Sequence, residues 1–178
     1  MQFFETERLV LRNVEAGDAD IMYDYRNKET CARFQRGQTK DLEGIKALIE
    51  RRKDDKLTAK NNSLLAIALK DNGEMIGEIV VMPNDGAISL GYTISYRYHR
   101  KGYAYEALHA LTEKLHTDYP DWDFVCFTER ENFASMELLK KLGYEYIGYA
   151  PKITSEVFGK WMKPDARKKI EEATQKQN

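Results

Sequence analysis

The sequence has few of the features that mark membrane, secreted or disulfide-bonded proteins. Its longest uninterrupted aliphatic run covers residues 64–69, far short of the roughly 20 residues that a membrane-spanning helix needs. No basic segment followed by an apolar one begins the chain, so we expect no signal peptide, no membrane association and a cytosolic protein. The only cysteines, Cys31 and Cys126, lie among apolar neighbours, which predicts buried free thiols.

An excess of charge of one sign is absent as well. The chain has 28 lysines and arginines against 29 aspartates and glutamates, and its net charge of −1 argues against direct nucleic-acid binding and a polybasic membrane surface. Its three histidines, His99, His109 and His116, are too scattered for a metal site, so we predict no metal. What is present is length and apolar content: 178 residues, 42% of them hydrophobic, suit one domain, which we expect to span residues 1–178.

Hydrophobic periodicity predicts strands and helices in a mixed order. The strand-like segments are residues 7–14, 63–70, 75–82, 87–96, 123–128 and 144–149. The helical patterns are residues 18–25, 41–54, 103–115 and 135–142, with Asp18 as the first cap and Gly143 ending the last. Residues 153–161 are the candidate for a last strand, and residues 163–177 are predicted as a charged C-terminal helix. This order predicts an α+β fold with a mixed, mostly antiparallel sheet flanked by helices.

The most informative segment is His99-Arg100-Lys101-Gly102-Tyr103-Ala104, between an expected strand and the expected main helix. The first N–H groups of a helix have no intrahelical partners and carry partial positive charge, so a helix N-terminus binds anions. Gly102 lets a ligand approach the backbone closely, and Arg100 and Lys101 add positive charge. Neither a Walker pattern nor a dinucleotide-binding glycine pattern occurs in the chain. The segment is therefore predicted to be a phosphate-binding turn of a different kind.

This turn resembles the acyl-CoA pyrophosphate loop of the GNAT N-acetyltransferases, written Gln/Arg-x-x-Gly-x-Gly/Ala, although His99 departs from its first position. Residues 132–135 and 138–144 resemble the family's Asn-x-x-Ser motif and its Leu-x-Lys-Leu-Gly-Phe/Tyr helix end. Residues 6–12 are similar to the Thr-Glu-Arg-Leu-x-Leu-Arg opening of the ribosomal-protein alanine N-acetyltransferase branch, which is RimJ- and RimL-like. The resemblance thus covers most of the chain.

The resemblance implies that the strand ending at Ser95 and the strand beginning near Asp123 splay apart around the pantetheine arm of acetyl-CoA, the cosubstrate. The N–H of Ile94 is implied to hold the thioester carbonyl. The implied pyrophosphate ligands are the loop residues Arg100, Lys101, Gly102, Tyr103 and Ala104. Asn132 is implied to contact the pantetheine or the thiol, and Ser135 the departing sulfur. Both are also ordinary residues for a helix N-terminus, so a purely structural role competes.

Two departures from the family's pattern leave the acid and the base open. Leu139 replaces a tyrosine that many GNAT enzymes use as the acid, and Ser89 stands where the branch often carries glutamate. The substitute bases are Glu78, Glu129 and Glu131, for which a solvated surface position is the alternative. Several tyrosines near the loop either pack in the core or line the acceptor cleft: Tyr92, Tyr96, Tyr98, Tyr103 and Tyr105.

The resulting hypothesis is an acetyl-CoA-dependent N-acetyltransferase in which a primary amine attacks the thioester directly in a ternary complex. No covalent intermediate is expected, because the sequence places no cysteine beside a histidine as an activated nucleophile. The acceptor is a protein N-terminus or a small amine, and the oligomeric state stays open, a homodimer included. A catalytically degenerate acyl-CoA-binding module and a non-enzymatic ribosome-associated protein are the alternatives.

Overall fold

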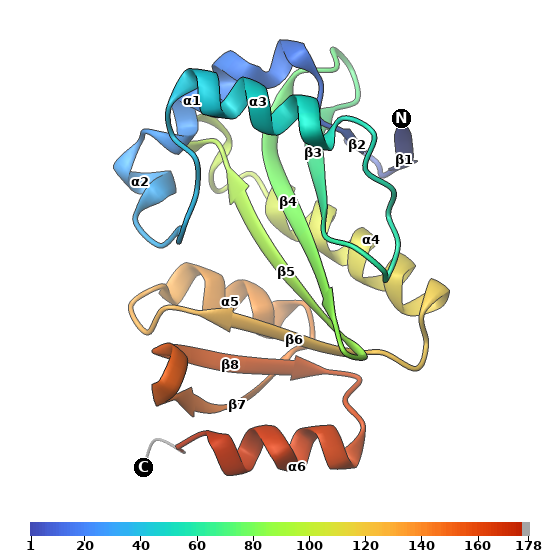
Figure 1. Ribbon diagram of the computed structural model, residues 1–178, viewed down its shortest axis with the longest axis vertical. Coiled ribbons are helices and arrows are strands. Elements are labelled where there is room, and N and C mark those ends of the chain that lie inside the picture. Colours follow the sequence, from blue (N-terminus) through green and yellow to red (C-terminus); the bar gives the residue numbers. More distant parts are fainter. Residues whose placement is uncertain (176–178) are drawn as a thin grey trace.

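The computed structural model describes residues 1–175, which form an eight-stranded sheet in the order β1-β2-β3-β4-β5-β6-β8-β7 (Figure 1). The strands are β1 (Gln2–Glu5), β2 (Leu9–Asn13), β3 (Ser63–Leu69), β4 (Met75–Asn84), β5 (Ala87–Ile94), β6 (Asp123–Thr128), β7 (Glu145–Ala150) and β8 (Ser155–Lys160). Neighbouring strands are antiparallel except β5 and β6, which are parallel. The predicted α+β class and mostly antiparallel sheet are confirmed.

Helices cover both faces of the sheet. They are α1 (Ala19–Arg26), α2 (Glu29–Ala32), α3 (Leu42–Arg52), α4 (Tyr103–Asp118), α5 (Phe133–Lys141) and α6 (Pro164–Ala173), with short 3₁₀ turns at Ala16–Asp18, Tyr96–Tyr98 and Pro151–Ile153. The apolar stripes of α4 and α5, which include Leu108, Leu111 and Leu139, pack in the largest core cluster. On the opposite face, α1 and α3 cover the N-terminal half of the sheet and α6 covers β7 and β8. Figure 1 shows α4 behind β4 and β5, and α6 alongside β7.

The centre of the sheet is open. Strands β5 and β6 pair only at their first residues, Ala87 with Asp123 and Ile88 with Phe124. Beyond these pairs the two strands diverge, as Figure 1 shows, so the backbone groups along the rest of β5 face a gap instead of a ladder. The splayed central pair expected from the family resemblance is therefore present.

The C-terminal region completes the sheet. Residues 153–161, the candidate last strand, supply β8, which pairs with both β6 and β7. The expected C-terminal helix is α6, which ends at Ala173; Lys176 and Gln177, the end of the predicted range, lie outside the described residues. Neither β1 nor the short helix α2 was predicted from the sequence pattern.

Asp18 does not cap α1 as expected. It lies at the N-cap position but makes no side-chain capping bond. Its carboxylate instead accepts two 2.8 Å bonds from the Arg12 guanidinium and a bond from the Glu15 N–H. The physical reason is that a bidentate, charge-assisted pair is stronger than a bond to a neutral helix N–H.

Candidate active site

The gap between β5 and β6 forms a cleft of about 820 Å³. Its walls come from β5, the turn after it, the first residues of α4, β6 and the start of α5, and from the segment that follows α2. Of the predicted site residues, those lining the cleft are Ile94, Arg100, Gly102, Tyr103, Ala104, Asn132 and Ser135. Lys101 is not among them; its ammonium lies 5.0 Å from the centre of the Tyr98 ring. Residues far apart in sequence thus meet at one site.

The turn after β5 presents the N-terminus of α4 to the cleft. Gly102 is the N-cap residue and has the left-handed angle φ = +82°, which a residue with a Cβ adopts only under strain. Arg100 is also left-handed, at φ = +61°. The first helical residues, Tyr103, Ala104 and Tyr105, line the cleft, and their N–H groups precede the first intrahelical donor, Glu106. This arrangement suits a phosphate group.

The opening motif of the chain holds this turn in place. Arg8 donates to the carbonyl of Lys101 at 3.0 Å and to the Glu106 carboxylate at 2.7 Å, and its guanidinium lies 4.4 Å from the centre of the Tyr103 ring. The Thr6 hydroxyl donates to the same carboxylate at 2.6 Å. Burial opposes ionisation, but the hydrogen bonds from Thr6 and Arg8 outweigh it and lower the pKa of Glu106. Residues 6–12, which were noted from the sequence only for their family resemblance, therefore also hold the turn before α4 in place. This role was not predicted from the sequence.

The ladder between β4 and β5 turns the Ile94 N–H toward the gap. Ser95 donates its N–H to the carbonyl of Ile76 at 2.8 Å, so the next pair, Ile94 opposite Gly77, is of the non-hydrogen-bonded type. In such a pair the N–H and C=O point away from the partner strand. The Tyr92 carbonyl, two residues along, points the same way and accepts from Gln35 at 3.0 Å. The Ile94 N–H thus has the orientation that the resemblance requires of it.

A cysteine lies beside a histidine in the cleft, which the sequence spacing does not indicate. Cys31 Sγ is 3.9 Å from His99 Nε2, although 68 residues separate them. His99 Nε2 is 2.8 Å from the Ile94 carbonyl, which can only accept, so this nitrogen carries a proton and is not a base toward the thiol. Burial raises the pKa of Cys31, which keeps it protonated. The pair lacks the features of an activated thiolate.

Asn132 and Ser135 lie at the capped N-terminus of α5 and also line the cleft, so the structural and the functional interpretation are both compatible with their positions. Asn132 Oδ1 accepts from the Ser135 N–H at 3.2 Å and so caps α5, while the residue also lines the cleft. The Ser135 hydroxyl oxygen accepts a bond of 2.9 Å from the Tyr92 hydroxyl across the gap. Burial raises the pKa of Tyr92 to about 12, so this phenol is a donor throughout the physiological range.

A model of the acetyltransferase (GNAT) domain matches residues 8–145. The chain belongs to the GNAT acetyltransferase family. The N-acetyltransferase YnaD of Bacillus subtilis strain 168, described as uncharacterized, is 26% identical over 149 residues, covering 83% of this chain and 85% of that protein. The solved ribosomal-protein-S5-alanine acetyltransferase of Vibrio fischeri shares the fold, with a TM-score of 0.71 at 18% identity, covering 93% of this chain and 98% of that one. The solved structure of RimL, a ribosomal L7/L12 α-N-protein acetyltransferase in complex with coenzyme A, also shares the fold. Its TM-score is 0.73 at 13% identity, and the match covers 90% of this chain and 97% of that one.

The two departures from the family's pattern have structural explanations in this GNAT acetyltransferase. The Ser89 hydroxyl donates to the Val125 carbonyl on β6 at 2.6 Å, which ties the two strands together just beyond their last backbone pair. Leu139, in the position of the family's tyrosine, is only 3% exposed and belongs to the core. The Ser89 hydroxyl hydrogen is thus used in a bond to the backbone, and the Leu139 side chain has no proton donor or acceptor.

The substitute bases occupy three different environments in the GNAT acetyltransferase. Glu78 is neither at the cleft nor on the surface: it is 2% exposed and bonded to the guanidinium of Arg26 and the amide of Gln38. Both expectations for it were wrong, because the cation that pairs with it comes from α1, 52 residues earlier. Glu131 is an exposed charge paired with Arg33 at 3.0 Å. Glu129 lines the cleft and is paired with Arg36.

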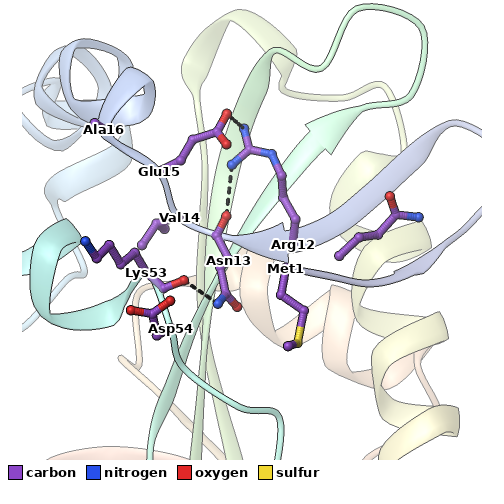
Figure 2. Close-up of a pocket in the computed structure, with 9 residues that line it drawn as sticks. Met1, Arg12, Asn13, Val14, Glu15, Ala16, Lys53 and Asp54 are labelled. Atoms are coloured by element: carbon purple, nitrogen blue, oxygen red, sulfur yellow. Dashed lines mark hydrogen bonds and ion pairs between the residues drawn. The ribbon is translucent and has the colours of Figure 1, made fainter.

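A second, smaller pocket of about 270 Å³ lies where β2 meets the end of α3 (Figure 2). Arg12 bonds to the Asn13 carbonyl and pairs with Glu15, and the Asn13 amide donates to the Lys53 carbonyl. The GNAT cleft is larger and contains most of the predicted site residues, so it is the better candidate for chemistry. Within residues 1–175 no helix is long and apolar enough to cross a bilayer, and no three His, Cys, Asp or Glu side chains are grouped to hold a metal.

Proposed function

We propose that this GNAT protein transfers the acetyl group of acetyl-CoA to a primary amine by direct attack in a ternary complex. The observation that carries the proposal is the convergence of three groups on one cleft: the outward N–H of Ile94, the N-terminus of α4 at Gly102, and the Asn132–Ser135 start of α5. Each suits a different part of acetyl-CoA.

In this proposal the cosubstrate lies along the gap. The turn from Arg100 to Ala104 and the first N–H groups of α4 hold the pyrophosphate, to which the helix end is electrostatically matched. The pantetheine runs between the splayed strands, where Asn132 offers its Nδ2 donor because Oδ1 is used by the cap. The Ile94 N–H holds the thioester oxygen, and such a preorganised donor stabilises the developing oxyanion by about 3 kcal/mol.

The chemical step needs a neutral amine and a proton for the leaving thiolate. An α-amine with a pKa near 8 is substantially neutral at physiological pH, so the cleft needs no strong base. The amine nitrogen bonds to the carbonyl carbon, the carbon–sulfur bond breaks, the nitrogen loses a proton to solvent and the sulfur gains one. We assign the sulfur's proton to the Ser135 hydroxyl, which regains a proton from solvent. Since Tyr92 donates to the oxygen of Ser135, the hydrogen of Ser135 is left to point elsewhere in the cleft. Tyr92 is thus a positioning residue for the acid.

Direct transfer is favoured over an acetyl-cysteine intermediate. Cys31, the only cysteine lining the cleft among the described residues, has a raised pKa, and the nearby His99 nitrogen is a donor to Ile94. A Cys31→Ala variant should therefore keep its thiol release, whereas a covalent mechanism requires complete loss.

The test pairs calorimetric titration of acetyl-CoA with a thiol-release assay over N-terminal peptides, amino-acid amides, polyamines and aminoglycosides. We expect binding and turnover with at least one amine class. Binding with no turnover over the whole panel would contradict the enzyme and favour the degenerate acyl-CoA-binding module. Absence of binding would overturn the assignment of the cleft itself.

A further inference from the structure

The cleft has a second face, which the cosubstrate groups do not use. Along β5, Leu90 and Ile94 pack toward α4, so the alternate residues, Ser89 and Gly91, face the side of α1 and α3. Met82 on β4 is opposite Ser89 in register and faces the same side; a Cβ on Gly91 would lie 3.6 Å from its methyl group. An acceptor that approaches from this face meets the thioester from the side opposite α4 and α5.

Three apolar side chains, Phe34, Met82 and Phe127, line this face; we call them the acceptor wall. Phe127 lies on the same side of β6 as Val125, which is buried in the cluster that includes Ile170 of α6. Phe127 is not in that cluster, and it is 47% exposed although it is aromatic. Burying half of a phenyl ring from water on ligand binding is favourable, since apolar area contributes about 25 cal/mol per Å². The wall therefore offers contact area to an apolar group, and none of its three side chains carries a charge.

The segment carrying Phe34 is fixed across the cleft. Gln35 donates to the Tyr92 carbonyl on β5, at one side of the gap. Arg36 reaches the other side, where it pairs with Glu129 and donates to the carbonyls of Ile153 and Thr154 at 2.9 and 3.2 Å. The wall is thus held in a defined position at both ends, which favours recognition of a particular shape over loose contact.

The charges in the cleft exclude one class of amine. Among the described residues that line it, Glu129 is the single carboxylate, and its charge is matched by Arg36. The other charged lining residues, Arg100 and Lys141, are cationic. Polyamines and aminoglycosides carry several ammonium groups, which require carboxylate partners and are repelled by cations.

We propose that the acceptor carries a single primary amine next to an apolar side chain, which contacts the acceptor wall. The proposal rests on the acetyl transfer proposed above and names its substrate class: an α-amine beside an apolar side chain, on either a free amino-acid derivative or a polypeptide N-terminus. Phe127 is the specificity-determining residue.

Conjugates that join both substrates test this without depending on turnover. The sulfur of CoA is linked through a –CH₂–CO– bridge to the α-nitrogen of phenylalaninamide, of glycinamide, or to a primary nitrogen of spermidine, and each is titrated calorimetrically beside CoA. We expect the phenylalaninamide conjugate to bind about tenfold more tightly than the glycinamide conjugate. The spermidine conjugate should bind no more tightly than the glycinamide one. Equal binding of the first two, or tightest binding of the spermidine conjugate, would overturn the proposal.

Variants locate the effect. Phe127→Ala should remove the tenfold preference for phenylalaninamide, and Phe127→Leu should retain most of it. Phe133→Ala is the matched control, because Phe133 is 69% exposed but does not line the cleft, and the preference should persist there. A preference unchanged in Phe127→Ala would contradict the role of this residue.

A further conjugate distinguishes a polypeptide N-terminus from a free amino-acid derivative as the acceptor. In it, the bridge joins the sulfur of CoA to the α-nitrogen of an eight-residue peptide that begins with phenylalanine. Tighter binding than the phenylalaninamide conjugate indicates a polypeptide N-terminus, and weaker binding a free amino-acid derivative. If neither CoA nor any conjugate binds, the proposed acetyl-CoA site fails; if CoA binds and the conjugates do not differ, only the acceptor assignment fails.

Discussion

The two faces of the cleft are built in different ways. The face proposed to bind the cosubstrate, which we call the cosubstrate face, consists mostly of backbone: an outward N–H at Ile94, the helix N-terminus at Gly102 and the capped start of α5. The face proposed to bind the acceptor, which we call the acceptor face, is the acceptor wall: three side chains, Phe34, Met82 and Phe127, from three separate segments. Backbone features need only a few glycine or capping residues in a fixed order, whereas side-chain features change with any substitution. We therefore expect substitutions to alter the proposed acceptor face more readily than the proposed cosubstrate face.

The segment that carries Phe34 of the acceptor face depends on a buried ion pair, and we expect a large loss of stability when that pair is broken. Arg26 is 3% exposed; it pairs with Glu78 and donates to the Thr39 carbonyl at 3.0 Å, at the end of the segment that carries Phe34. Arg26→Met leaves a buried, unpaired carboxylate and should lower the free energy of unfolding by about 3–5 kcal/mol. Arg33→Met, which breaks the exposed pair with Glu131, should lower it by at most about 1 kcal/mol. Urea denaturation measures both.

A double variant sharpens this prediction. Arg26→Met combined with Glu78→Leu removes both charges and should recover most of the stability lost in Arg26→Met alone. If the double variant is as unstable as the single one, packing of Arg26 rather than the unpaired charge is responsible.

The cosubstrate face should depend on the backbone at Gly102. Gly102→Val places a branched side chain on a left-handed residue beside the loop amides and should weaken acetyl-CoA binding by well over tenfold, by obstructing their approach to the pyrophosphate. Gly86→Val is the matched control: its φ of +80° imposes the same backbone strain in the β4–β5 turn, with open space around it. Calorimetry should show normal affinity in that variant and a comparable loss of melting temperature in both. Equal affinities would mean that the pyrophosphate lies elsewhere.

Local patterns predicted the elements that the cosubstrate face uses, and tertiary contacts explain most of what they missed. The apolar run of β6 and the glycine turn before α4 are visible within a few residues, and both formed as expected. The Tyr92–Ser135 bond joins residues that are 43 positions apart, and Cys31 and His99 are 68 positions apart. No local sequence pattern can predict contacts over such separations. Strand β1 was missed because its four residues, two phenylalanines between polar residues, are too short for a periodic signal.

Loss of the Tyr92–Ser135 hydrogen bond should have an intermediate effect on catalysis. Tyr92→Phe should lower kcat about fivefold, the value of one hydrogen bond, with little change in acetyl-CoA affinity. Because the pKa of Tyr92 is raised to about 12, the wild-type rate should show no inflection from this group below about pH 11, and loss of activity should follow only as the phenol ionises. Tyr105→Phe, another tyrosine of the cleft, is the control and should keep the wild-type kcat.

A double-mutant cycle distinguishes positioning from packing. Ser135→Ala alone should lower kcat, and adding Tyr92→Phe should lower it no further, since both act through one hydroxyl. Fully additive losses would show that Tyr92 acts independently of Ser135.

The smallest effect should come from Ser89, where the branch often has glutamate. Ser89→Ala removes the bond to the Val125 carbonyl and should lower the free energy of unfolding by about 1 kcal/mol. Thiol release should change less than twofold if Ser89 only ties β5 to β6. A loss of kcat as large as that of Ser135→Ala would instead place Ser89 in the chemistry.

Backbone amide NMR during an acetyl-CoA titration tests the central claim, that the splayed cleft is the acyl-CoA site. The largest chemical-shift changes should fall on the amides of Tyr92 and Ile94, on the turn from Arg100 to Tyr105, and at the start of α5 near Asn132 and Ser135. The pocket of Arg12 and Lys53 should stay unchanged. Saturable binding with its largest shifts at that pocket, and none at Ile94 or Gly102, would contradict the account.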